Sequence, residues 1–173
     1  VVIEPTKKLA DLSKPEDIWV AFTPVKKIRT DFIIEKCTEI GVRKISPVIS
    51  DHSANRRPRI DKWKLNSIEA VEQCGGNFIP TIEEATSFRE FIVNFPEDRK
   101  LIFCDEKKES SELMFKTLSP LKNSIKKFAV FIGPEGGFSD DEHEMILKND
   151  NVIAVSLGER LLRSDTAITV SLF

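Results

Sequence analysis

The sequence predicts an α/β fold in which a parallel sheet is flanked by helices. Short apolar runs rich in β-branched residues recur along the chain, and most of them lack a polar alternate residue. Runs of this kind are typical of strands that are covered on both faces. They lie far enough apart for a helical crossover between each pair, and this alternation of strands and helices is typical of the α/β class.

Six apolar runs predict the strands of this sheet. They are residues 18–22, 44–49, 78–82, 100–104, 127–132 and 152–157. Two of the segments between them have helical periodicity, because apolar residues recur on one face over 60–74 and again over 88–95. We therefore expect helices in both places.

Local signals mark where several helices end or begin. Gly41 and Gly75 each follow a helical stretch and suit a left-handed C-terminal cap. Residues 139–142 read Ser-Asp-Asp-Glu, a capping box with acidic residues in the first turn, so a helix is predicted to begin there. A final helix is expected near Ser164 or Asp165, either of which could serve as its N-cap.

The composition is that of an ordinary globular protein with one main domain. The chain has 173 residues, of which 40% are hydrophobic and 31% charged, and this is enough to bury one core. A formal net charge of -2 gives no basic excess of the kind found in histone-like nucleic-acid binders. The apolar runs are far shorter than a membrane-spanning helix, so we expect no membrane partner.

Cysteines and histidines give no sign of a disulfide or a metal site. Cys37, Cys74 and Cys104 lie far apart, with neither disulfide nor zinc spacing, which fits a reducing cytoplasm. His52 is expected in a loop and His143 on an acidic helix face, with no His or Cys partner at ligand spacing. We therefore expect no bound metal.

One short segment is strongly basic. Residues 56–64 carry a net charge of +4 in a chain whose total charge is negative. Arg56, Arg57 and Arg59 in this segment are the candidate contacts to RNA phosphates. The competing interpretation is a solvated loop and helix start, which is what most such runs are.

Two glycine-containing loops follow consecutive predicted strands. They are 133–137, Gly-Pro-Glu-Gly-Gly, and 157–160, Leu-Gly-Glu-Arg. Ligands of open α/β sheets bind beyond the carboxyl ends of the strands, where glycine permits close approach. Neither loop has the G-x-G-x-x-G pattern of dinucleotide sites or the Gly-Lys-Ser/Thr of a P-loop. Tight strand-to-helix turns are the competing explanation for the glycines.

Five blocks of sequence in a fixed order carry a resemblance to a known family. They are Arg29; Lys36 to Val42 with Pro47; Glu72 to Gly75 with Asn77 and Pro80; Ile132 to Phe138; and Leu157 to Ala167. From about residue 18 onward, the chain closely resembles the ribosomal RNA small-subunit methyltransferase E family of the SPOUT superfamily.

The resemblance implies an activity, a fold and a domain organisation. The family uses S-adenosylmethionine to methylate N3 of one uridine in 16S ribosomal RNA, acts as a homodimer, and threads its C-terminal segment into a deep trefoil knot. Its members carry an N-terminal PUA-like barrel. We therefore expect residues 1–17 to be a remnant or linker of that barrel, and 18–173 to be the methyltransferase domain, truncated at its C-terminus.

The resemblance also implies which residues contact the cofactor. They lie at the ends of three predicted strands and in the loops that follow: Cys104, Ile132, Gly133, Gly137, Leu157, Gly158, Leu161 and Leu162. Arg29 joins the basic segment as an expected RNA contact. Gly76 replaces the family's usual arginine, and Asp165 replaces a commoner glutamate.

The chemistry of the implied reaction assigns roles to three further residues. Uridine N3 must lose a proton, so the site needs a base or a positive group that stabilises the developing anion. Arg163 is the candidate for that positive charge, although a surface arginine at a helix start is the simpler interpretation. Asp165 could orient Arg163 or accept the proton, and Glu135 is the alternative base.

Two other functions are weighed against this one. A related SPOUT enzyme that methylates ribose 2'-hydroxyls would be served equally well by the two glycine loops. A non-catalytic RNA-binding or ribosome-assembly module that retains the knot is favoured by Gly76. The five-block match argues against the first, and Arg163 together with the intact glycine loops argues against the second.

Overall fold

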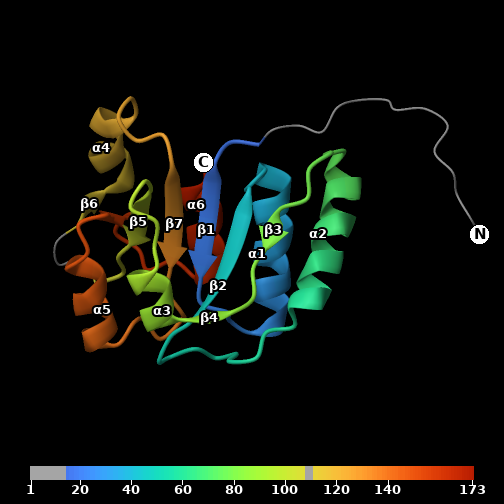
Figure 1. The fold of residues 1–173 in the computed structure, drawn as a ribbon, viewed down its shortest axis with the longest axis horizontal. Coiled ribbons are helices and arrows are strands. Elements are labelled where there is room, and N and C mark those ends of the chain that lie inside the picture. Colours follow the sequence, from blue (N-terminus) through green and yellow to red (C-terminus); the bar gives the residue numbers. More distant parts are fainter. Residues whose placement is uncertain (1–14, 108–110) are drawn as a thin grey trace, which may run out of the picture.

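Parallel strands form the centre of the molecule (Figure 1). The computed structural model describes residues 15–107 and 111–173, so most of the expected remnant at 1–17 lies outside the described residues. Within the described part, eight strands make one sheet in the order β3-β2-β1-β7-β5-β8-β6, and β4 pairs with β2. The strands are β1 (Ile18–Phe22), β2 (Lys44–Ile49), β3 (Thr81–Ile82), β4 (Thr86–Ser87), β5 (Lys100–Cys104), β6 (Glu112–Leu113), β7 (Phe128–Ile132) and β8 (Val152–Ser156).

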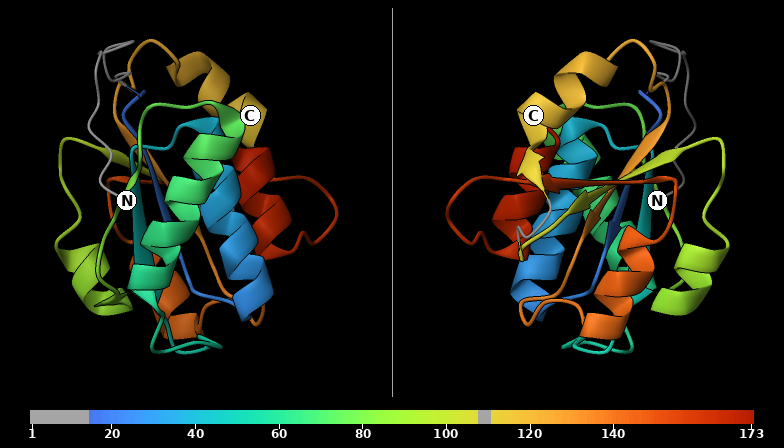
Figure 2. Two further views of the ribbon diagram at one scale, coloured as in Figure 1. Left: turned by 90° about the vertical axis from the view of Figure 1, so that its right-hand side faces the viewer. Right: turned by 90° about the vertical axis from the view of Figure 1, so that its left-hand side faces the viewer.

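Helices cover both faces of this sheet (Figure 2). They are α1 (Lys27–Ile40), α2 (Ile60–Cys74), α3 (Phe88–Val93), α4 (Met114–Leu118), the 3-10 helix η1 (Ser119–Leu121), α5 (Asp140–Leu147) and α6 (Ser164–Ser171). One face is covered by α1, α2 and α6, and the other by α3 and α5. The predicted α/β class with a parallel sheet is therefore confirmed.

Each face of the sheet has its own apolar core, as the strands without polar alternates predicted. Val20 and Phe22 of β1 belong to the cluster under α1, α2 and α6, which also includes Trp63. Ala21, between them, faces the opposite cluster under α3 and α5, where Phe103 and Phe131 are buried. Successive residues of a strand point to opposite faces, so both must be apolar when both are covered.

The C-terminal helix returns to the middle of the sheet. The chain leaves β8, which β5 separates from β7, yet α6 packs against α1 and β7. Residues 157–163 make this return as a projecting loop (Figure 2). The path brings the loop and the start of α6 to the carboxyl ends of the central strands, where Ser164 contacts Gly133, whereas the C-terminus lies toward the other end of the strands (Figure 1). The trefoil knot stays a prediction.

The predicted helix ends agree closely with the structure. Gly41 and Gly75 cap α1 and α2 in the left-handed conformation, with φ of 89° and 70°. Ser139 caps α5 in a complete capping box, in which its side chain accepts the backbone N–H of Glu142 and the Glu142 carboxylate accepts that of Ser139. These motifs act locally, which is why the sequence alone reveals them.

The third predicted strand is wrong in extent. Only Thr81–Ile82 of the expected 78–82 pairs with β2, and a second short strand, Thr86–Ser87, follows. Pro80 has no N–H to donate, so it cannot extend the ladder toward the start of the run. The structure also adds β6 and α4, which no apolar run had indicated.

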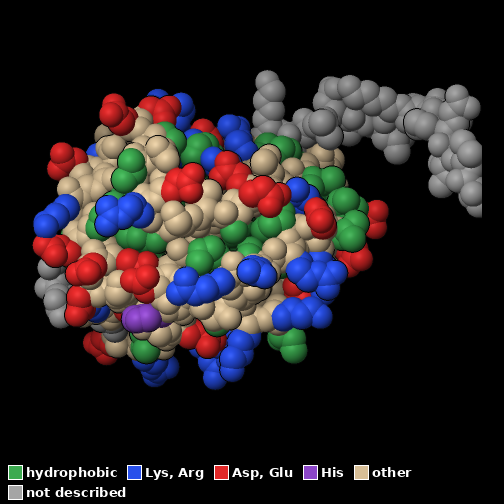
Figure 3. Space-filling view, turned by 60° about the horizontal axis from the view of Figure 1, so that its bottom comes forward, with side chains coloured by type: hydrophobic (Ala, Val, Ile, Leu, Met, Phe, Trp, Pro, Cys, Tyr) green, Lys and Arg blue, Asp and Glu red, His purple; other side chains and the backbone are tan. Residues whose placement is uncertain are grey.

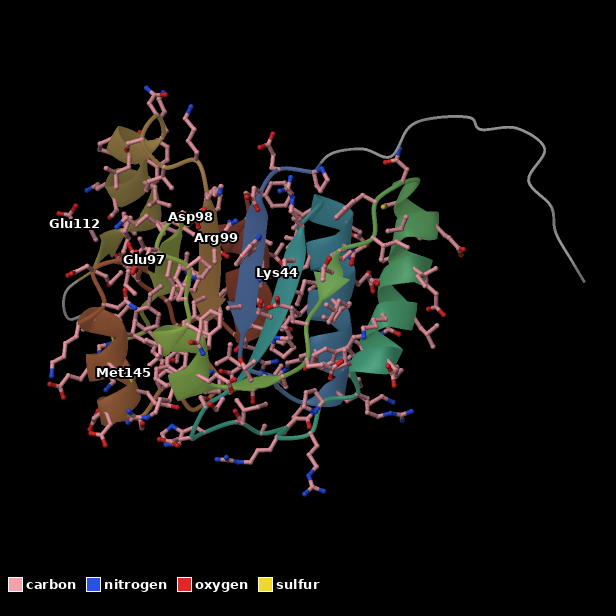
Figure 4. All side chains as sticks on the ribbon, viewed as in Figure 1. Lys44, Glu97, Asp98, Arg99, Glu112 and Met145 are labelled. Atoms are coloured by element: carbon pink, nitrogen blue, oxygen red, sulfur yellow. The ribbon has the colours of Figure 1, made fainter. Side chains whose placement is uncertain are left out.

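A buried arginine fixes the amino-terminal end of the sheet. The Arg99 side chain is 3% exposed; it pairs with the Asp17 carboxylate at 2.9 Å and donates to the carbonyls of Asp17 and Phe128, both at 2.9 Å. Its guanidinium carbon lies 3.5 Å from the Trp19 ring centre, and Lys44 Nζ lies 3.3 Å from the same centre. Arg99 and Lys44 lie on either side of β1 (Figure 4).

Replacing Arg99 with alanine should lower the free energy of unfolding by roughly 3 kcal/mol, because it leaves the partner carboxylate and two carbonyls without their donor. Urea denaturation measures this loss, with exposed Arg89→Ala as the control, for which the expected loss of stability is near zero.

Burial raises the pKa of Asp17, but hydrogen bonding and charge from Arg99 outweigh the effect of burial and lower the pKa overall. The pair's contribution should therefore be complete above pH ~4 and decline as the pH falls through that lowered pKa. Equal stability of Arg99→Ala and wild type would contradict this assignment.

Candidate functional site

A cavity of ≈ 320 Å³ lies where β5, β7 and β8 end. Its walls come from residues 104–106, 132–135, 157–158 and 160–164, with Arg29 of α1 and Ala167 of α6. The carboxyl ends of parallel strands meet at one edge, which is where ligands of open α/β sheets bind. The volume falls within the range of small-molecule sites.

Most of the residues expected at the cofactor site line this cavity. They are Cys104, Ile132, Gly133, Leu157, Gly158, Leu161 and Leu162. The two glycine loops are far apart in sequence, and the return of α6 to the centre of the sheet brings the second loop beside the first. The structure thus brings together the segments that the sequence singled out.

Gly133 and Gly137 make room for protein side chains, whereas the sequence analysis expected these glycines to permit close approach of a ligand. A Cβ on Gly133 would lie 2.7 Å from the Phe138 ring, so this glycine makes room for a buried aromatic side chain. Gly137 has a φ of 71°, and a Cβ there would overlap the Glu106 carboxylate. Gly137 does not itself line the cavity. Its lack of a side chain makes room for Glu106, which does.

Of the two glycines that line the cavity, Gly158 is the one with open space at its Cβ position. Its φ is 121°, a conformation that side chains disfavour, and nothing lies within 4 Å of where a Cβ would be. Gly158 lines the cavity, and its carbonyl and N–H both contact the Ser156 hydroxyl. This loop is therefore held by a local hydrogen-bonded turn while its glycine leaves the cavity open.

Arg29 and Glu135 form an ion pair at the cavity. Arg29 comes from the first turns of α1 and Glu135 from the loop after β7, and their side chains are 25% and 38% exposed. Arg29, expected as an RNA contact, thus lies beside a candidate base. The pair orients the Glu135 carboxylate and leaves both groups accessible.

Arg163 lines the cavity, whereas Asp165 does not. Arg163 itself is the N-cap of α6 and makes no side-chain cap, so the expected capping by Ser164 or Asp165 is wrong. The Ser164 hydroxyl instead donates to the Gly133 carbonyl at 3.0 Å, which pins the start of α6 to the loop after β7. The Asp165 carboxylate accepts the N–H of Thr166 at 3.0 Å, and no described contact joins it to Arg163.

The cysteine at the end of β5 has a largely buried thiol. Burial raises the pKa of the Cys104 thiol to about 12, so the thiol stays protonated at neutral pH. All three cysteines are free in the structure. Cys104 therefore contributes apolar surface to the cavity.

The sequence analysis missed the place of three residues in this region. Asp105 and Glu106 line the cavity directly after β5. His143, expected on an acidic helix face, is buried, and its Nε2 lies 2.9 Å from Asp105 Oδ1. Two acidic residues directly after a buried strand were the available signal for the first two. The His143 pairing joins residues too distant in sequence for any local pattern to reveal.

The basic segment lies outside the cavity, at the end of the loop between β2 and α2 and in the first turn of α2. Arg56 donates to the Asp51 carbonyl at 2.7 Å, whereas Arg57 and Arg59 are exposed and have no ion pair within the described residues. Viewed from the end where the strands finish, Lys and Arg side chains gather toward α1 and α2 (Figure 3). This arrangement places the positive charge of Arg57 and Arg59 on the surface, outside the cavity.

The described residues contain neither a cluster of metal ligands nor a membrane-spanning helix. Over 15–107 and 111–173, no group of three or more His, Cys, Asp and Glu side chains could hold a metal ion. None of the helices described is long and apolar enough to cross a membrane.

Comparison with known proteins identifies relatives of the whole described chain. The family model for the RNA methyltransferase domain matches residues 12–173. Ribosomal RNA small subunit methyltransferase E of Buchnera aphidicola is 34% identical over 173 residues, covering 96% of this chain and 65% of the relative. The enzyme of the same name from Bacillus subtilis is 27% identical, covering 96% of this chain and 67% of its own length. The chain thus spans about 65% of the first of these relatives.

Solved structures give the same result. Ribosomal RNA small subunit methyltransferase E of Neisseria gonorrhoeae, bound to S-adenosyl methionine, superposes with a TM-score of 0.81 at 28% identity, over 95% of this chain and 67% of that one. A putative methyltransferase of Legionella pneumophila in complex with the same cofactor gives 0.79 at 29%, over 91% and 64%. These matches confirm the resemblance, and the chain belongs to the RNA methyltransferase domain family represented by ribosomal RNA small subunit methyltransferase E.

Proposed function

We propose that the chain is the catalytic part of an enzyme that transfers a methyl group from S-adenosylmethionine to N3 of a uridine in 16S ribosomal RNA. The observation that carries this proposal is the cavity at the ends of β5, β7 and β8, where Arg163 meets both glycine loops. The cofactor named for the Neisseria and Legionella structures supports the choice of ligand.

The cavity has the mixed character that this cofactor requires. Ile132, Leu157 and Leu162 supply apolar surface for an adenine ring, while acidic and arginine side chains supply polar contacts for its ribose and amino-acid parts. When bound, S-adenosylmethionine supplies an electrophilic methyl group on a sulfonium. The protein's task is then to place the acceptor atom in line with that group at attack distance.

Arg163 stabilises the charge that develops on the uridine. Loss of the N3 proton spreads negative charge onto O2 and O4, and a guanidinium with planar donors can bind such an oxygen. Arg163 is exposed, lines the cavity and has no ion-pair partner within the described residues, so it is available for this role. The adjacent loop and Ser164 anchor fix where its backbone lies.

Glu135 is the base that the geometry favours. It lines the cavity, whereas Asp165 lies outside and contacts its own helix. The ion pair with Arg29 holds the Glu135 carboxylate in place. The carboxylate stays accessible to a uridine whose nucleobase has been flipped out of its stack. Arg57 and Arg59 on the neighbouring loop suit contacts to RNA phosphates.

A methyl-transfer assay tests this proposal. The full-length protein is incubated with small ribosomal subunits that lack the modification and with methyl-labelled S-adenosylmethionine, and the RNA is then digested to nucleosides for mass spectrometry. The expected product is 3-methyluridine. Label in a ribose 2'-O-methyl nucleoside would favour the related ribose methyltransferase instead, and absence of transfer would favour a non-catalytic module.

We also propose that the protein is a homodimer that works in the cytoplasm, and that residues 18–173 form its methyltransferase domain. α1 and α6 pack against each other, and each exposes apolar side chains: Ile28 and Phe32 on α1, and Val170 on α6. Neighbouring exposed apolar groups favour an interface, and a second copy of the chain is the occupant expected from the resemblance. Three free cysteines suit a reducing compartment.

Light scattering at tens of micromolar should give the mass of a dimer, and Ile28→Glu should shift it toward the monomer. Ile28 is 84% exposed, so the charge costs the single chain little but would be buried by a partner. Phe115→Glu on α4 is the matched control, because Phe115 is 82% exposed and its helix packs on β6 and β8. A wild-type monomer, or a dimer indifferent to Ile28→Glu, would refute this interface.

A further inference from the structure

Two adjacent carboxylates line the cavity where β5 ends. Asp105 is fixed, because its side chain is completely buried and its Oδ1 contacts His143 Nε2 at 2.9 Å and accepts the N–H of Lys107 at 3.0 Å. Its other oxygen, Oδ2, has no hydrogen-bond partner in the described part of the chain. A buried carboxylate oxygen without a partner is costly, so the local environment favours a nearby positive charge.

Glu106 is the accessible member of the pair. It lines the cavity, is partly exposed, and has no hydrogen bond or ion pair with another described residue. Burial raises the pKa of Glu106, and the adjacent Asp105 charge raises it further. The charge of neighbouring Lys107 offsets this rise only in part, and Lys107 Nζ itself pairs with Asp140 Oδ1 at 2.5 Å.

The loop after β7 fixes the direction of Glu106. Gly137 lies beside the Glu106 carboxylate, because a Cβ added to this glycine would overlap Glu106 Oε1. His52 Nδ1 contacts the Gly137 carbonyl at 2.9 Å, which holds this part of the loop. Gly137, the second glycine of the Gly-Gly pair, thus leaves room for the Glu106 side chain after β5. The sequence pattern did not reveal this role.

We propose that Glu106 binds the α-ammonium group of S-adenosylmethionine, with the buried Asp105 carboxylate behind it adding negative potential. This inference rests on the proposed function, since it assigns one end of that cofactor. A cation relieves the repulsion between two neighbouring carboxylates, whereas a neutral ribose hydroxyl does not. The same cavity holds Arg160, so it presents charges of both signs to a zwitterionic amino-acid group.

A double-mutant cycle between protein and ligand tests the assignment. Isothermal titration calorimetry compares S-adenosylhomocysteine with its des-amino analogue, in which hydrogen replaces the α-ammonium group, on wild type and Glu106→Gln. Wild type should prefer S-adenosylhomocysteine by roughly 10-fold or more, typical of a hydrogen bond to a charged group. Glu106→Gln should bind the two ligands about equally, and its affinity for the des-amino analogue should match that of wild type.

Glu112→Gln is the matched control, since Glu112 is exposed on β6 and points away from the molecule (Figure 4). It should keep the wild-type preference. If Glu106→Gln lowered the affinity for both ligands equally, Glu106 would lie at the nucleoside and the assignment would be overturned. A variant that kept the wild-type preference for S-adenosylhomocysteine over the des-amino analogue would overturn it as well. Failure of wild type to bind S-adenosylhomocysteine at all would instead refute the proposed function. Thermal unfolding of each variant confirms that the compared proteins are folded.

Discussion

Replacing Arg163 with alanine in the full-length protein should lower the rate of methyl transfer by about 10²-fold or more, the loss typical of removing one stabilising group. Cofactor affinity should change only slightly, because the guanidinium acts on the uridine anion. Lysine should rescue the rate poorly, since a point charge does not replace a planar fork of donors. Single-turnover methylation measures the rate, and calorimetry measures the cofactor affinity.

The competing role for Arg163 is structural, at the start of α6. The structure argues against it, because Arg163 is exposed and makes no side-chain cap, while the Ser164 hydroxyl anchors the helix. Thermal unfolding of Arg163→Ala should therefore match wild type within about a degree or two, as for most surface substitutions. A normal rate of methyl transfer in Arg163→Ala, combined with a lowered melting temperature, would contradict the catalytic assignment.

Gly158→Val should abolish binding of S-adenosylhomocysteine while the chain still folds. A valine there projects into the open space of the cavity, where no atom lies within 4 Å of the Cβ position. The φ of 121° also strains any side chain, at about 1–3 kcal/mol. Calorimetry measures the binding, and urea denaturation measures the strain.

Gly41→Val separates these two effects. Gly41 also has a positive φ, 89°, and open space at its Cβ position, but it caps α1 outside the cavity. Both variants should lose stability, and only Gly158→Val should lose the ligand. If the two variants bind equally well, Gly158 is not at the cofactor site. Gly137→Val would be a less clear test, because it displaces Glu106 rather than entering the cavity.

The fold was predictable where the signal is local. Buried strands such as β1 and β7 show as apolar runs because both faces of the sheet are covered, and glycine caps and the capping box act within one turn of helix. The short strands β3, β4 and β6 have two residues each, too few to show a period. Their pairing depends on neighbours that the sequence does not place.

The candidate site was predictable as a set of segments but not as a set of contacts. The glycine loops and Arg163 line one cavity, as their order and the resemblance implied. The ion pair of Arg29 with Glu135 and the contact of His143 with Asp105 join elements far apart in sequence. Such pairings follow from how the helices pack on the sheet, so no spacing in the sequence could indicate them.

The central claim is that the cavity at the ends of β5, β7 and β8 is the S-adenosylmethionine site. A crystal structure of the protein grown with saturating S-adenosylhomocysteine tests it most directly. The account predicts density for the ligand in contact with Ile132 of β7 and with Gly158 after β8, and its amino group beside Glu106. Ligand density elsewhere on the molecule, with this cavity filled only by solvent, would contradict it.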